Sequence, residues 1–173
     1  MSDGNWDEVV ERTTMFFDGL GDEGHYQAAS SHMQRGMVRA ARAEDAAAAE
    51  DAARTLELAR PVGDPQLTGA TLLGVAFIYM TIGDPARAAE LLDESLEYIR
   101  GLGDLGWVVV ELHGLAWVAY KLGRGDELLA AVEGERLETP WLLAARAIAA
   151  GDFVRAVEIS GEMGDVSLEA FSR

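Results

Sequence analysis

The chain contains no cysteine in its 173 residues. This absence excludes a disulfide scaffold and a thiolate metal site, and it fits a reducing compartment, so we expect a cytoplasmic protein. Residues 1–5 hold neither a basic region nor an apolar run, and we expect no signal peptide there. The most apolar stretch, residues 67–82, is too short to span a bilayer and is interrupted by threonine and glycine.

Basic residues are scarce as well. The chain has 14 Lys and Arg against 30 Asp and Glu, a formal net charge of −16, and Lys121 is its only lysine. That charge opposes non-specific attraction to the phosphates of nucleic acids and to anionic membranes. We therefore expect neither nucleic acid nor a membrane among the partners.

Strand patterns are missing too, whereas helical patterns fill the chain. No stretch alternates polar and apolar residues with a period of two, and apolar residues recur every three or four positions instead. Asp64-Pro65, Asp84-Pro85 and Thr139-Pro140 each combine a capping side chain with a proline that suits the first helical turn. The predicted helices span residues 6–19, 26–42, 45–60, 66–82, 86–101, 107–122, 125–134, 140–150, 152–163 and 166–173.

Short turns divide these helices into pairs. A turn such as Gly83-Asp84 precedes the second helix of each pair, and these turns follow one another at spacings of 39, 40, 40 and 28 residues. A helix pair cannot bury its apolar face alone, so the repeat predicts stacked pairs. The expected units of this single domain, 1–173, are 1–25, 26–63, 64–104, 105–137 and 138–165, with 166–173 as a truncated helix.

Residues 83–92, together with Ala76 and Tyr79, resemble a tetratricopeptide repeat. Ala76 and Tyr79 hold the small and aromatic positions of the first helix, and Ala88 holds the small position of the second. The resemblance implies an all-α fold, a right-handed superhelix of antiparallel helix pairs. Residues 139–156 and 169–173 are also similar to the end of the repeat region of large bacterial regulators of the ATPase/adenylate cyclase type or the LuxR type. Because the chain holds neither ATPase nor cyclase motifs, it is expected to be a fragment or a stand-alone relative.

The first helix of each pair lines the concave face in tetratricopeptide arrays. The resemblance therefore implies a groove with apolar and aromatic side chains. Its expected residues are Met33, Met37, Leu73, Phe77, Met80, His113, Trp117, Tyr120, Lys121, Trp141 and Ile148. Exposed apolar patches mark partner sites, so we predict a non-catalytic module that binds a peptide, a helix or a neighbouring domain.

Three alternatives stay open at this point. The stripe can simply be core, filled by neighbouring helices. The chain can instead form a homodimer or larger homo-oligomer through the terminal helices, which carry Phe16, Phe17 and Phe171. It can also sense a small apolar ligand in the aromatic part of the groove, which comprises Phe77, Trp117, Tyr120 and Trp141.

Arg35, Arg39 and Arg42 form the only basic stripe, at i, i+4 and i+7 of one helix. Arg35 and Arg39 depart from the repeat pattern, which expects apolar residues at their positions. One interpretation is a site for an anion or an acidic partner. The other is pairing with acidic residues of the adjoining helix, namely Glu44, Asp45, Glu50 and Asp51.

The sequence shows no pattern typical of an enzyme, a cofactor site or a metal site. Its two G-x-G-x-x-G matches, residues 19–24 and 101–106, follow predicted helices rather than strands, so they indicate turns and not a dinucleotide site. His25, His32 and His113 lack a second ligand at i+3 or i+4. We therefore expect no catalysis, cofactor or metal.

Overall fold

The computed structural model describes residues 5–20, 27–102, 104–136 and 138–164, and the predicted helix 166–173 and His25 lie outside them. Within these ranges the chain forms nine α-helices, two short 3₁₀ helices and no strand, so the all-α prediction is confirmed. The α-helices are α1 (Trp6–Leu20), α2 (Ala28–Ala41), α3 (Asp45–Ala59), α4 (Pro65–Thr81), α5 (Pro85–Gly101), α6 (Leu112–Lys121), α7 (Gly125–Ala131), α8 (Pro140–Ala149) and α9 (Phe153–Met163). The 3₁₀ helices are η1 (Arg60–Val62) and η2 (Gly106–Glu111). None of the helices in these ranges is long and apolar enough to cross a membrane.

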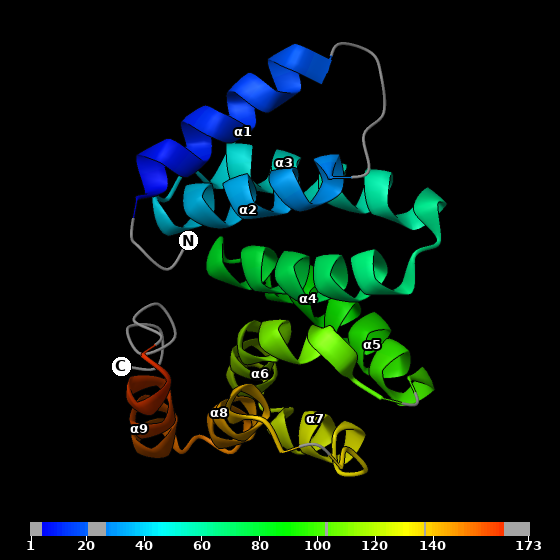
Figure 1. Cartoon of the computed structure of the whole chain (residues 1–173), viewed down its shortest axis with the longest axis vertical. Coiled ribbons are helices and arrows are strands. Elements are labelled where there is room, and N and C mark those ends of the chain that lie inside the picture. Colours follow the sequence, from blue (N-terminus) through cyan, green and yellow to red (C-terminus); the bar gives the residue numbers. More distant parts are fainter. Residues whose placement is uncertain (1–4, 21–26, 103, 137, 165–173) are drawn as a thin grey trace.

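The helices follow the long axis of the molecule in chain order, from α1 at one end to α7, α8 and α9 at the other (Figure 1). The main contacts within pairs join α2 to α3, α4 to α5 and α8 to α9. Successive pairs meet through their first helices, with α2 against α4, α4 against α6 and α6 against α8, and α3 contacts α4 as extensively as α2 does. One core cluster runs from α2 to α9, whereas α1 contributes no buried side chain among those described and contacts α2.

Polar side chains begin four of the helices as the sequence predicts. The Oδ1 atom of Asp64 accepts a hydrogen bond from the backbone N–H of Leu67 at 2.8 Å, and it thereby caps α4. Asp84, Thr139 and Asp152 cap α5, α8 and α9 in the same way. These side chains satisfy N–H groups that have no partner inside the helix.

The turn inside each of the four pairs has one shared backbone geometry. Its central residue has a left-handed φ in every pair: Ala43 (57°), Gly83 (83°), Gly123 (69°) and Gly151 (76°). The following residue donates its N–H to the carbonyl five positions earlier, at 2.8–2.9 Å. This is a Schellman motif, which favours glycine because a Cβ is strained in the left-handed region.

Two glycines allow neighbouring helices to approach each other closely. A Cβ on Gly74 of α4 would overlap the sulfur of Met33 on α2, and a Cβ on Gly125 of α7 would overlap the carbonyl oxygen of Ala149 on α8. A larger residue at Gly125 would force α7 and α8 apart, because the obstacle is backbone, whereas at Gly74 the Met33 side chain would have to move.

The predicted helix 107–122 differs from the structure at its start, because residues 106–111 form the 3₁₀ helix η2. No side chain caps the segment, and Gly106 has a left-handed φ of 52°. The β-branched residues Val108, Val109 and Val110 crowd the preceding turn of an α-helix. Regular α-helix therefore begins only at Leu112.

Candidate functional site

Three of the expected groove residues lie in the core. Met33, Leu73 and Ile148 are only 5%, 1% and 0% exposed. Met33 fills the space over Gly74 between α2 and α4, and Leu73 and Ile148 belong to the same core cluster. These three residues therefore do not line a groove as predicted. The helical period shows on which side of a helix a residue lies, but it does not show how deeply that side is buried.

The other side chains remain at least partly exposed, and we call seven of them the aromatic stripe. It comprises Met37, Phe77, Met80, Trp117, Tyr120, Lys121 and Trp141. Tyr120 and Trp141 are 42% and 37% exposed, while Met37, Phe77, Met80 and Trp117 are half-buried. The stripe is drawn from α2, α4, α6 and α8, the first helices of the four pairs.

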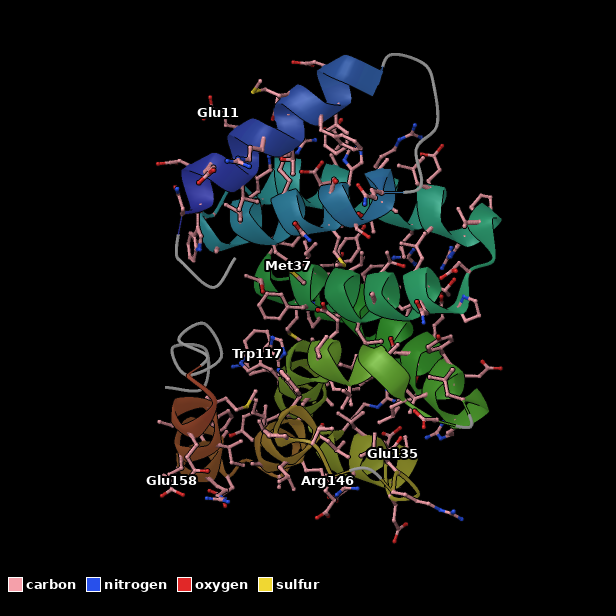
Figure 2. All side chains as sticks on the ribbon, viewed as in Figure 1. Glu11, Met37, Trp117, Glu135, Arg146 and Glu158 are labelled. Carbon is pink, nitrogen blue, oxygen red and sulfur yellow. The ribbon has the colours of Figure 1, made fainter. Side chains whose placement is uncertain are left out.

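The stripe follows the repeat. Met37, Phe77 and Trp117 are 40 residues apart and occupy the same place in three successive first helices. Figure 2 shows Met37 on one side of α4 and Trp117 on the other, toward α6. Met80 and Tyr120 are likewise 40 residues apart and continue the stripe along α4 and α6.

Aromatic contacts connect parts of the stripe. The ring centroids of Phe77 and Trp117 are 5.5 Å apart with an interplanar angle of 55°. The ammonium of Lys121 lies 5.9 Å from the Trp117 ring centroid, within reach of a cation–π interaction. Tyr120 makes an edge contact with Phe153 of α9, at 4.9 Å between centroids. The stripe therefore offers apolar faces beside a cation.

His113 lies beside the stripe on α6 and is half-buried. Its Nδ1–H donates to the carbonyl of Val110 at 2.9 Å, so the ring is held by the backbone. Burial raises the pKa of the neighbouring Glu111 carboxyl, and the charge of His113 opposes that rise.

Two members of the basic stripe bind one buried carboxylate. Asp51 on α3 is 1% exposed. Arg35 donates to it through Nε at 2.9 Å and Nη2 at 2.6 Å, and Arg39 donates through Nη1 at 2.8 Å. These two arginines thus pair with an acidic residue of the adjoining helix, which was one of the two interpretations of the sequence. Arg42 instead contacts Asp7 of α1 at 2.6 Å.

Two further residues complete this group, which we call the Asp51 cluster: His32, Arg35, Arg39, Asp51 and Phe17. The Nδ1 atom of His32 lies 2.8 Å from Oδ1 of Asp51. Phe17 of α1 stacks on the His32 ring at 3.9 Å and lies 4.6 Å from the guanidinium carbon of Arg35. The cluster thus fixes α1 on α2. The sequence reasoning missed His32 and Phe17 as members.

Hydrogen bonds and charge oppose burial at Asp51. Burial alone raises the pKa of its carboxyl. Hydrogen bonds from His32 and Arg35, with the positive charges of Arg35 and Arg39, outweigh that effect and hold the pKa below its ordinary value. The carboxylate is therefore ionised at neutral pH and serves as the anchor of two guanidinium groups.

The repeat explains why charges occupy these positions. In the next pair, 40 residues further on, the places of His32, Arg35 and Asp51 are taken by Leu72, Val75 and Leu91. Those three are buried, at 6%, 0% and 0% exposure. In the first pair the same surface is covered, among the described residues, by α1 and not by a full helix pair, so mutually paired polar residues suit it. Comparison of residues 40 positions apart was the signal in the sequence that could have identified His32 as a member of the cluster.

The described residues contain no group of three His, Asp or Glu side chains arranged to hold a metal ion. Comparison of the chain with protein-family models, curated proteins and solved structures gave no match.

Proposed function

We propose that the chain is a non-catalytic protein-interaction module that binds an amphipathic helical segment of a partner protein along the aromatic stripe. The stacked pairs support a tetratricopeptide-like superhelix, in which the first helices α2, α4, α6 and α8 line the concave side. Such a role fits the repeat regions of the bacterial regulators that the chain resembles.

One observation carries this proposal. The repeat position held by Met37, Phe77 and Trp117 is large and apolar in three successive helices, yet it is half-buried each time. A position kept for the core alone would be buried like its neighbours Leu73 and Ala76. Aromatic and methionine side chains that stay partly exposed in a row are typical of partner surfaces.

The charge of the chain defines the chemistry of the partner. With a net charge of −16, the chain attracts a segment that carries Lys or Arg, and the basic residues of that segment must lie away from Lys121, the one cation of the stripe. The apolar residues of that segment recur every three or four positions, because this spacing places them all on the helix face that meets the stripe. The occupant is therefore a basic amphipathic helix.

A displayed library of helical peptides tests the proposal. Selection on the immobilised protein should enrich peptides with apolar residues at i, i+3 or i+4 and i+7 and with net positive charge. Fluorescence anisotropy should show at least tenfold weaker binding to Trp117→Ala or Phe77→Ala, as expected for an interface centre.

The control is Val154→Ala on α9, an exposed apolar residue (73%) outside the stripe, which should bind as the wild type does. Circular dichroism must show that each variant keeps its helical content. Failure to select any peptide, or equal affinity of selected peptides for Trp117→Ala and wild type, would contradict the proposal.

A further inference from the structure

The Asp51 cluster has more positive than negative charge at its centre. Two guanidinium groups, those of Arg35 and Arg39, share the single carboxylate of Asp51. The side chains of Arg35 and Arg39 are 12% and 21% exposed, so solvent screens this excess charge only partly. Besides Asp51, Arg39 has one further counter-ion, Glu44, whose Oε2 lies 4.0 Å from its Nε. A partly buried guanidinium with so long an ion pair favours binding of a closer anion.

An open cavity of about 530 Å³ lies directly on this cluster. His32, Arg35, Arg39 and Asp51 line it, and Arg54 and Glu50 lie on it as well. Arg54 is paired with Glu57 at 2.6 Å, so it adds no net charge. The volume falls in the range of small-molecule sites, which is larger than a bare inorganic ion needs.

One donor of the cluster has no hydrogen-bond partner among the described residues. The Nε atom of Arg39 is buried, and the ion pair that it forms with Oε2 of Glu44 spans 4.0 Å, too long for a hydrogen bond. Leaving a buried donor unsatisfied is costly, and a charged donor more so. The Nδ1 atom of His32 is engaged by Asp51, which leaves Nε2 as the ring nitrogen that can donate to a ligand.

We propose that this cavity binds the oxyanion end, carboxylate or phosphate, of a small molecule. Arg35 and Arg39 are held in place by Asp51, so the site needs little rearrangement before the anion arrives. The Nε–Nη2 fork of Arg35 already holds Asp51, so the anion binds to the N–H groups that Asp51 leaves over, chiefly those of Arg39. Charged N–H donors of this kind suit both carboxylate and phosphate oxygens. Glu50 opposes the anion and sets an upper limit on its affinity. The site is separate from the aromatic stripe and does not depend on it.

Thermal unfolding with added acetate, phosphate or glycerol phosphate, each at an ionic strength matched with sodium chloride, tests the proposal. A ligand of the folded state raises the midpoint in proportion to the logarithm of its concentration. Glycerol phosphate should act at a lower concentration than inorganic phosphate if the ligand is a phosphate ester, and acetate should be the most effective if it is a carboxylate. Isothermal calorimetry measures the affinity directly.

Three variants make the outcome decisive. Arg39→Gln should weaken binding at least tenfold, and Glu50→Gln, an exposed change that leaves the fold intact, should strengthen it several-fold. Arg87→Gln is the matched control, since Arg87 is an arginine ion-paired with Glu90 on α5, away from the cavity, and it should behave as the wild type. Equal responses of wild type, Arg39→Gln and Glu50→Gln would overturn the proposal. If Arg39→Gln does not fold, Glu50→Gln alone decides.

Discussion

Ala43 ends α2 in a backbone conformation that the other three helix pairs give to glycine. Its φ is 57°, and it is the only non-glycine residue with a positive φ in the described ranges. Ala43 is exposed, so removal of its methyl group leaves no cavity. Replacing Ala43 by glycine therefore isolates the cost of a Cβ in the left-handed region.

The expected magnitude follows from two opposing terms. A left-handed φ costs an L-residue about 1–2 kcal/mol, and that strain disappears in Ala43→Gly. Glycine loses more conformational freedom on folding, which takes back roughly 0.5–1 kcal/mol. The net stabilisation should be about 0.5–1 kcal/mol, which raises the unfolding midpoint of a chain of this size by about 2 °C.

Urea unfolding followed by circular dichroism measures this change. Ala43→Gly should raise the urea midpoint with an unchanged m-value, because the surface exposed on unfolding stays the same. The reciprocal control is Gly83→Ala in the second pair, where a Cβ would meet nothing within 4 Å. Gly83→Ala should lose about as much stability as Ala43→Gly gains. A lower midpoint for Ala43→Gly would refute this account of the turn.

The other predictions concern two carboxyl groups, those of Asp51 and Glu111. Asp51→Asn should lower the free energy of unfolding by about 3–5 kcal/mol, because it leaves two partly buried guanidinium groups without their carboxylate. The depressed pKa of Asp51 gives stability that is fully present above the carboxyl's ordinary pKa and is lost as the pH falls through the folded value. Urea unfolding at a series of pH values should therefore show a steeper loss at acidic pH for wild type than for Asp51→Asn. Glu111 has a raised pKa, so stability falls as the pH rises from its ordinary range through the folded value, and Glu111→Gln should be more stable than wild type at pH 7. Equal urea midpoints of Glu111→Gln and wild type at neutral pH would exclude a burial cost at Glu111.

Local signals in the sequence were sufficient for the helices. The Asp-Pro and Thr-Pro pairs place helix starts within one residue, since the cap and the fixed φ of proline act on the adjacent backbone alone. The start of α6 was misplaced because the valines before it form a 3₁₀ turn, and apolar spacing does not distinguish this turn from an α-helix.

Burial depth was less predictable, because it depends on the distance between helices. Leu73 and Phe77 lie one turn apart on α4, yet Leu73 is fully buried while Phe77 stays half-exposed. Neighbouring helices surround α4 unevenly: Met33 of α2 lies over Gly74, whereas Phe77 lies against Gly114 of α6, and the sequence of α4 alone does not reveal either contact. The Asp51 cluster was missed in part for a similar reason: the packing of α1 on α2 brings Phe17 onto His32 across 15 residues of chain.

The repeat also explains why the two candidate sites occupy different parts of the fold. A surface between two pairs must be apolar, and the buried Leu91 of α5 meets that requirement. Within the part of the chain that the structure describes, the equivalent surface of the first pair is covered by α1, so Asp51 can replace leucine there if partners neutralise it. A charged pocket is therefore compatible with this surface of the first pair, whereas an apolar stripe can run along every pair. If His32→Leu, Arg35→Val, Arg39→Tyr and Asp51→Leu were combined, this surface would carry the residue types of the next pair and become largely apolar. The chain should then tend to associate through it, while the aromatic stripe keeps its affinity for a basic helix.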